Sequence, residues 1–131
     1  MPDIPRGNRP LSPFMLGSAY RFQWTSFSSI LNRITGLGLA LGAVLVVWWL
    51  IAAATGPRAF AVADGFLRSP LGELILLGSL WALWYHMLAG IRHLVWATGR
   101  LLEIRNAVRF GQAIFALSFV LTGLTVLILW I

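Results

Sequence analysis

The chain contains two histidines, His86 and His93, and both lie in one strongly apolar stretch. Ionisable side chains are costly at membrane depth, so each histidine is a candidate functional residue. Their spacing of seven residues is close to two helical turns, which puts both imidazoles on one helix face, about 10 Å apart along the axis. His86 is therefore either an axial ligand of haem iron or a polar residue in a helix contact.

One haem cannot be clamped between these two histidines, because its axial ligands lie on opposite sides of the ring. The sequence has no third histidine. If His86 binds haem, a ligand from a partner chain is the simplest way to complete a six-coordinate iron. A five-coordinate iron and a methionine ligand are the alternatives.

A second group of polar side chains precedes the first apolar run and consists of Ser28, Ser29, Asn32 and Arg33. Antiparallel helices bring Arg33, Arg92 and His93 to a similar depth in the inner half of a membrane. A guanidinium or a serine hydroxyl can donate to a quinone carbonyl, and a guanidinium can pair with a haem propionate. Alternatively, the arginines extend to the membrane surface, and Ser29 caps a helix or bonds to the backbone.

The chain that positions these side chains is too apolar for a soluble domain. Of its 131 residues, 59% are hydrophobic and 11% are charged, and its mean hydropathy is +0.82. A soluble domain carries about 25% charged residues, so a soluble globule and a disordered segment are both excluded. Cysteine is absent, which excludes disulfides and thiolate metal sites.

Three apolar runs are each long enough to cross a bilayer about 30 Å thick, which needs about 20 residues. The sequence predicts spans over residues 30–54, 71–97 and 110–131, joined by connections of about 15 residues. A polar, proline-rich arm covers 1–29, and the membrane anchor covers 30–131. Ser69 is the candidate cap of the second span, with Pro70 in its first turn. The predicted fold is an all-α membrane protein with three transmembrane helices.

The arginines are divided unevenly between the two ends of these spans. Eight share the side of the arm and of the second connection: Arg6, Arg9, Arg21, Arg33, Arg92, Arg100, Arg105 and Arg109. The other side holds Arg58 and Arg68. Because cations collect on the cytoplasmic side of membranes, we expect the N-terminus inside, in a cytoplasm or a mitochondrial matrix, and the C-terminus outside.

The tryptophans partly follow the belt that is typical of membrane interfaces. Those expected near the two interfaces are Trp24 and Trp96 on the inner side and Trp48, Trp49 and Trp130 on the outer side. Trp81 and Trp84 fall in the middle of a span. They require an explanation from packing or from a pocket.

Two stretches carry a resemblance to a known family. Ser29-Ile-Leu-Asn-Arg-Ile-Thr-Gly36 opens the first span, and His86-Met-Leu-Ala-Gly-Ile-Arg-His-Leu94 closes the second, with Arg9-Pro10-Leu-Ser-Pro13 upstream. The family pattern is Ser-Ile-x-His-Arg-x-Thr/Ser-Gly, followed by His-x-x-x-Gly-x-Arg-His. In these motifs, and in the order of its spans, the chain resembles the cytochrome b membrane-anchor subunit of succinate dehydrogenase, which is respiratory complex II.

The resemblance implies an anchor that pairs with a second hydrophobic subunit, with one haem b held between them and a ubiquinone site beside the iron–sulfur subunit. It implies that His86 is the axial ligand of the haem iron, and that Ser29 and Arg33 contact the quinone. It also implies that Arg33 meets a haem propionate, and that Arg92 and His93 are polar groups beside the haem.

Two positions depart from the family pattern. Asn32 stands where the family usually has histidine, beside the haem propionates, and an asparagine can donate a hydrogen bond but cannot carry a charge. Ala97 stands where the family usually has aspartate, three residues after Leu94. The loss of that acid removes a candidate for proton delivery or for a salt bridge to the following loop. The predicted ligand His86 is unaffected.

The resemblance thus implies a membrane anchor of succinate:ubiquinone oxidoreductase, which links the tricarboxylic acid cycle to electron transport. The chain has no Gly-rich dinucleotide motif and no cysteine, so the flavin and iron–sulfur chemistry belongs to separate flavoprotein and iron–sulfur subunits. This subunit is not catalytic alone. The alternatives are a three-span assembly protein without redox function and the anchor of a related fumarate reductase.

The surroundings of the protein follow from its charge pattern. The arginines flank apolar runs, so lipid is the expected partner surface and nucleic acid is not. The expected location is the bacterial inner membrane, in preference to the mitochondrial inner membrane.

Overall fold

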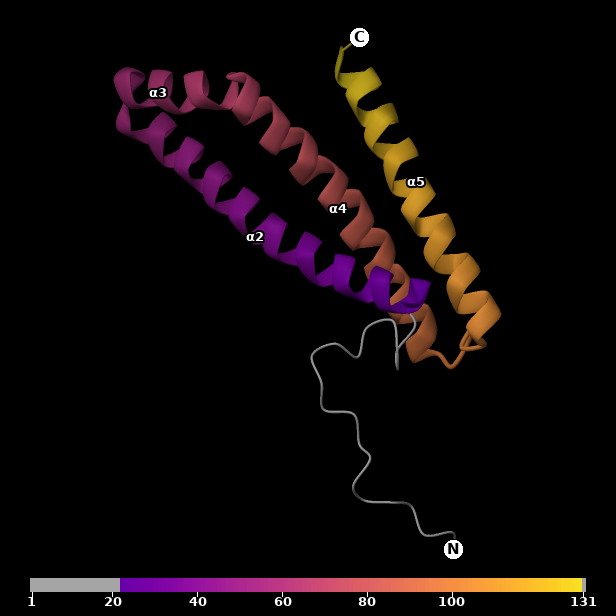
Figure 1. The fold of residues 1–131 in the computed structure, drawn as a ribbon. Coiled ribbons are helices and arrows are strands. Elements are labelled where there is room, and N and C mark those ends of the chain that lie inside the picture. Colours follow the sequence, from indigo (N-terminus) through magenta and orange to yellow (C-terminus); the bar gives the residue numbers. More distant parts are fainter. Residues whose placement is uncertain (1–21, 131) are drawn as a thin grey trace, which may run out of the picture.

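The computed structural model describes residues 22–130, and these are helical apart from short connections (Figure 1). The helices are α2 (Trp24–Thr55), α3 (Pro57–Leu67), α4 (Pro70–Ala97) and α5 (Ile104–Trp130). Three of them, α2, α4 and α5, are long and apolar enough to cross a membrane. The predicted all-α fold with three candidate spans is therefore confirmed. Residues 1–21 of the predicted arm, with Arg6, Arg9, Arg21 and the proline motif, lie outside the described residues.

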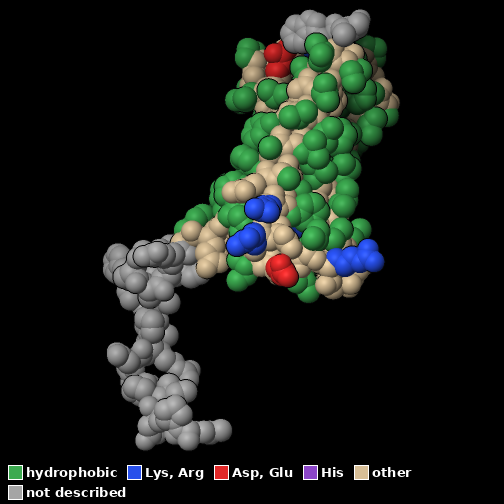
Figure 2. All heavy atoms as spheres, turned by 90° about the vertical axis from the view of Figure 1, so that its right-hand side faces the viewer, with side chains coloured by type: hydrophobic (Ala, Val, Ile, Leu, Met, Phe, Trp, Pro, Cys, Tyr) green, Lys and Arg blue, Asp and Glu red, His purple; other side chains and the backbone are tan. Residues whose placement is uncertain are grey.

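The central element is α4, because both α2 and α5 run alongside it in opposite directions to it (Figure 1). Trp24, the first residue of α2, packs against Phe115 of α5 with ring centroids 5.8 Å apart. We call this end the arginine-rich end, and it holds the start of α2, the end of α4 and the start of α5. Figure 2 shows cationic side chains at this end and a broad band of hydrophobic side chains above it.

The opposite end is closed by α3, a short helix that lies within the first predicted connection. It crosses from the end of α2 to the start of α4 (Figure 1). Trp48 packs against Phe66 of α3, with ring centroids 5.8 Å apart, and Trp49 packs against Phe60 at 5.6 Å. The predicted cap is confirmed, since Ser69 Oγ accepts a hydrogen bond from the Gly72 backbone N–H at 3.2 Å.

The connection between α4 and α5 is shorter than the predicted 15 residues and covers residues 98–103. The helix α5 begins at Ile104, ahead of the predicted start near residue 110. Its first turns carry Arg105 and Arg109, both exposed. Hydropathy marks only the part of a helix that lies in the hydrocarbon region, so a polar first turn escapes detection.

The mid-span tryptophans are explained by contacts with α5. Trp81 Nε1 donates a hydrogen bond to Ser118 Oγ at 3.0 Å, and Trp84 Nε1 donates to Thr125 Oγ1 at 3.0 Å. Both hydroxyls in turn donate to backbone carbonyls of α5 at 2.7 Å. Each indole N–H is therefore paired, as a polar group inside a membrane span has to be.

Gly72 lies where the first turn of α4 touches the last turn of α3. A Cβ at this position would meet the carbonyl oxygens of Phe66 and Leu67, the latter at 2.6 Å. Gly72→Ala is therefore expected to lower the stability of the assembled protein by about 1–3 kcal/mol, as overpacking does. The measurement is the thermal midpoint of the purified complex.

Gly65→Ala is the matched control for this substitution. It adds the same methyl group to α3 at a position where a Cβ meets nothing within 4 Å. It should leave the midpoint unchanged or raise it slightly, because alanine favours helix over glycine. Equal midpoints for the two variants would contradict the predicted clash.

Candidate functional site

The imidazole of His86 leaves α4 toward α2 and is held there by the backbone. Its Nδ1 lies 3.1 Å from the carbonyl oxygen of Asn32 and 3.3 Å from Thr35 Oγ1. The ring can approach this closely because residue 36 is glycine, where a Cβ would lie 3.0 Å from Cε1 of His86. Asn32, Thr35 and Gly36, which belong to the motif that opens the first span, therefore form the contact surface of the candidate ligand. We call these three residues the His86 seat.

The hydrogen bonds of this seat assign the tautomer of His86. A carbonyl oxygen only accepts, so the contact with Asn32 requires the proton on Nδ1. The hydroxyl of Thr35 donates to the carbonyls of Leu31 and Asn32, at 2.9 and 3.0 Å, and can also accept from Nδ1. The lone pair is then on Nε2, which has no hydrogen-bond partner within residues 22–130. A histidine fixed through Nδ1 with Nε2 unprotonated is arranged as a metal ligand.

Asn32, at the position where the resemblance led us to expect histidine, contributes to this seat through its backbone. The contact with His86 uses the main-chain carbonyl, so the change of side chain leaves it intact. The side-chain oxygen of Asn32 is buried and makes no hydrogen bond to any described residue. An unpaired buried acceptor is expected where another molecule supplies the donor.

Ser29 and Arg33 lie one turn apart on α2, so their side chains share a face. Both are exposed, and both line a shallow hollow of about 360 Å³ together with Thr25, Ser26 and Ile30. Among the described residues, no carboxylate lies within ion-pair distance of Arg33. The structure thus brings together the two predicted quinone residues, on a surface that a second molecule can reach.

Arg92 points away from this hollow and into the bundle. Only 1% of the residue is exposed. Its Nη1 donates to Ser28 Oγ at 3.0 Å, and its guanidinium carbon lies 4.7 Å from the centre of the Trp96 ring. Within the described residues no carboxylate pairs with it, and its Nε is buried without a hydrogen bond. Extension to the membrane surface was one alternative that the sequence left open for this arginine. The structure contradicts that alternative, because the Arg92 side chain is enclosed in the bundle.

His93 lies apart from His86. It is exposed, and its ring stands edge-on to Trp96, with centroids 5.5 Å apart. The structure therefore separates the predicted haem-side residues, because Arg92 is enclosed whereas His93 is open to a neighbour. Their contact with haem stays a prediction.

Tyr85 was not singled out by the sequence. It is 1% exposed, and its hydroxyl donates to the backbone carbonyl of Ser28 at 3.0 Å. The only feature of the sequence that could have drawn attention to Tyr85 is its position directly before the candidate ligand His86. Its partner lies 57 residues away, and no local pattern indicates that contact.

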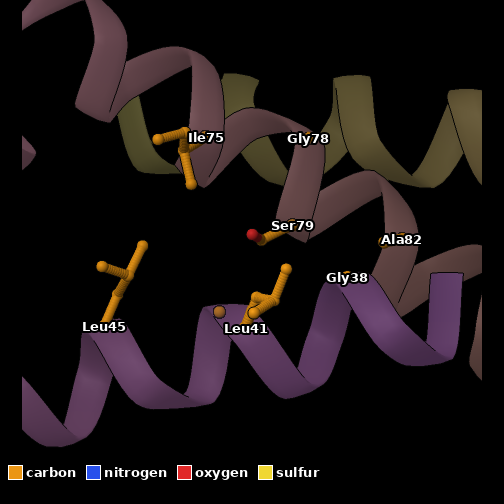
Figure 3. Close-up of a pocket in the computed structure, with 8 residues that line it drawn as sticks. Gly38, Leu41, Leu45, Ile75, Gly78, Ser79 and Ala82 are labelled. Atoms are coloured by element: carbon orange, nitrogen blue, oxygen red, sulfur yellow. The ribbon is translucent and has the colours of Figure 1, made fainter.

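A separate groove lies between α2 and α4 (Figure 3). Its lining residues follow Gly36 on α2 and precede His86 on α4, so it lies on the α3 side of the His86 seat. Its volume is about 240 Å³, and it is lined by Gly38, Leu41, Gly42, Leu45, Ile75, Gly78, Ser79 and Ala82. A Cβ at Gly42 would lie 3.2 Å from Ser79 Oγ, so small residues set the close approach of the two helices here. The groove has no ionisable lining residue, and the candidate chemistry is elsewhere.

Comparison with known proteins agrees with this architecture. The family described as succinate dehydrogenase/fumarate reductase transmembrane subunit matches residues 5–125. The succinate dehydrogenase cytochrome b556 subunit of Paracoccus denitrificans is 51% identical over 131 residues, covering 100% of this chain and 99% of that protein. The cytochrome b560 subunit of Reclinomonas americana is 35% identical over 133 residues, covering 95% and 85%. The cytochrome b556 subunit of Rickettsia felis is 31% identical over 123 residues, covering 94% and 91%.

The family match spans nearly the whole chain, including all of α2 and α4 and most of α5. Relatives of similar length match it almost from end to end. The chain therefore belongs to the family of transmembrane subunits of succinate dehydrogenase and fumarate reductase.

Proposed function

We propose that this chain is the cytochrome b anchor of a succinate:ubiquinone oxidoreductase, with His86 as an axial ligand of haem b and with Ser29 and Arg33 in the ubiquinone site. The observation that carries the proposal is the seat of His86. Its Nδ1 is bonded to the Asn32 carbonyl at 3.1 Å, which leaves Nε2 as the ligand atom. The names of the relatives support a cytochrome b.

A haem would be held by His86 through Nε2, which has no hydrogen-bond partner among residues 22–130, because the contacts of the ring with α2 are made by Nδ1. When bound, a haem supplies a one-electron carrier in the membrane. The Asn32 carbonyl and Thr35 keep the imidazole oriented, and the exposed Arg33 and His93 are available to the propionates. The buried Arg92 would have to leave the bundle to reach a propionate, so its predicted haem contact is the least supported of the set.

The quinone-site residues act by donating hydrogen bonds. A quinone carbonyl in the hollow would accept from the Ser29 hydroxyl and from the Arg33 guanidinium. As that oxygen gains negative charge on reduction, the guanidinium stabilises it, because charge-assisted hydrogen bonds are stronger than neutral ones. Among the described residues Arg33 has no anionic partner, so its charge is available for this role.

The proposal requires other subunits. A second hydrophobic subunit would provide the opposite haem ligand, since His93 shares the helix of His86 and is turned toward Trp96. An iron–sulfur subunit and a flavoprotein subunit would deliver the electrons from succinate. Many large apolar side chains of α2, α4 and α5 are exposed, as expected for faces that meet lipid and a membrane partner.

Fumarate reduction is the second candidate function, because the family description names both enzymes. The relatives are named as subunits of succinate dehydrogenase, which favours succinate oxidation. An assembly protein without redox function is disfavoured by the same names. Co-purification from native membranes, followed by identification of the partners and a reduced-minus-oxidised spectrum, tests the proposal directly.

The orientation is proposed from the arginines, with the arginine-rich end inside the cell and the protein in a bacterial inner membrane. A reporter enzyme that folds only in the periplasm, fused after Ile131, is expected to be active. A reporter that is active only in the cytoplasm should be silent at the same position. The physical reason is the preference of cationic segments for the cytoplasmic side. The reverse pattern of activity would overturn the orientation and put the quinone hollow on the wrong face.

A further inference from the structure

We infer that Tyr85 and Arg92 are positioning residues for the quinone site, because together they fix Ser28 and thereby orient Ser29 and Arg33. This inference rests on the proposed function of Ser29 and Arg33. It assigns no contact with the quinone to Tyr85 or Arg92. Both act through the backbone and side chain of one residue of α2.

Two side chains of α4 hold Ser28 at two different atoms. The Tyr85 hydroxyl donates to its carbonyl oxygen at 3.0 Å, and Arg92 Nη1 donates to its Oγ at 3.0 Å. The Ser28 hydroxyl donates its own proton to the Thr25 carbonyl at 3.0 Å, so its oxygen is free to accept from Arg92. Each group has a consistent donor and acceptor role, and Ser28, Tyr85 and Arg92 are at most 2% exposed.

The start of α2 is also held by ring packing of Trp24 and Phe27 on Phe115 of α5, but its directional tether to α4 is the pair of hydrogen bonds at Ser28. Its N-cap residue, Gln23, makes no side-chain cap hydrogen bond, and no acidic residue lies in the first turn. Ser29 follows Ser28 directly and so lies about 100° further round the helix. Holding Ser28 against α4 therefore turns Ser29 outward, together with Arg33 one turn later. The hollow lined by Ser29 and Arg33 is therefore on the face of α2 that is turned away from the hydrogen bonds at Ser28.

The choice of an arginine for this tether is informative. A buried guanidinium without a counter-ion is costly, and an apolar side chain of similar size often gives equal or greater stability. Arg92 has no carboxylate partner among the described residues, and its neutral neighbours are Ser28 and the Trp96 ring. Stability alone therefore does not account for this residue, whereas the placement of Ser28 gives it a specific role.

The test compares variants of the intact complex in native membranes, with a short-chain ubiquinone as the probe. Tyr85→Phe removes only the hydroxyl and should raise the KM for the quinone about fivefold, the loss expected for one hydrogen bond. Succinate oxidation with a soluble dye, measured per assembled complex, should be unchanged. Arg92→Leu should raise the KM further, and Arg92→Lys should recover part of that change, because a lysine still donates to Ser28 Oγ.

Thr125→Val is the matched control, because it removes the acceptor of another side-chain hydrogen bond from α4, the partly buried one of Trp84. It should leave the quinone KM at the wild-type value. If Tyr85→Phe or Arg92→Leu lowers only the amount of complex, with an unchanged KM in what assembles, their role is structural and the inference is wrong. A shifted haem spectrum in Arg92→Leu without a change in KM would assign Arg92 to the haem instead.

The variants Ser29→Ala and Arg33→Leu separate this inference from the proposed function. If both lower quinone reduction while Tyr85→Phe leaves the KM unchanged, the quinone site stands and the positioning role is refuted. If neither variant affects quinone reduction, the proposed site itself is wrong, whatever the behaviour of Tyr85→Phe.

Discussion

His86→Leu is expected to abolish the low-spin haem signal of the assembled complex, or to shift it to that of a haem with one protein ligand. Leucine has no lone pair to replace Nε2, and within the described residues no other imidazole reaches the seat formed by Asn32, Thr35 and Gly36. The helices should still assemble, because their packing rests on many contacts. The measurement is a low-temperature reduced spectrum with paramagnetic resonance of the intact complex.

His93→Leu is the matched control, since it removes the other imidazole of the same helix. His93 is exposed and turned edge-on to Trp96, so its loss should leave an axially ligated haem with an altered reduction potential. An unchanged low-spin signal in His86→Leu would remove the cofactor assignment. Loss of the signal in His93→Leu alone would exchange the roles of the two residues.

Arg33→Leu is expected to lower succinate–quinone activity about ten- to a hundredfold, the effect of losing a charged hydrogen-bond donor. Arg33 is exposed and has no carboxylate partner among the described residues, so its removal should disturb neither the fold nor the assembly. The readouts are quinone reduction and the amount of complex, measured on the same membranes. Dye-linked succinate oxidation should be preserved.

Arg33→Lys serves as the conservative comparison. It keeps the charge but loses the planar arrangement of donors, and it should restore activity only in part. Normal quinone activity in Arg33→Leu, with normal amounts of complex, would show that this arginine only extends to the membrane surface.

The three spans were predictable because each is a long, nearly uncharged run. The same uniformity hides how each helix is rotated. A helix that is apolar all round does not indicate which face turns inward, so the sequence could not tell that Arg92 enters the bundle. That direction depends on Ser28 and on Gly111, where a Cβ would lie 3.2 Å from Arg92 Nη1. The helix α3 was also beyond prediction, since it is short and is held by Trp48 and Trp49 of α2.

The seat of His86 was predictable only in part. The motif residues of α2 were recognised, but which of their atoms meet the imidazole follows from the register of α2 against α4. In this register Ser28 lies opposite Arg92, and Asn32 lies opposite His86. The sequence predicted that Arg33 lies at the depth of Arg92. In the structure Ser28 lies at that depth, and Arg33 is displaced from it by about one helical turn.

The two tryptophan bonds between α4 and α5 have a further consequence for how this membrane protein finds a single structure. Two apolar helices in lipid can slide along each other through several arrangements of similar energy, because no water penalises any of them. Trp84 lies three residues after Trp81 on α4, whereas its partner Thr125 lies seven residues after Ser118 on α5.

Since α4 and α5 are antiparallel, the two bonds run in opposite directions along the helix axes: Trp84 lies nearer the arginine-rich end than Trp81, whereas Thr125 lies farther from that end than Ser118. A shift of α5 by one turn in either direction would set at least one indole against isoleucine, leucine or phenylalanine. An unpaired N–H in hydrocarbon is expensive. The two indole hydrogen bonds can therefore form together in only one register of α4 against α5. They select that register on helix surfaces that are otherwise uniformly apolar.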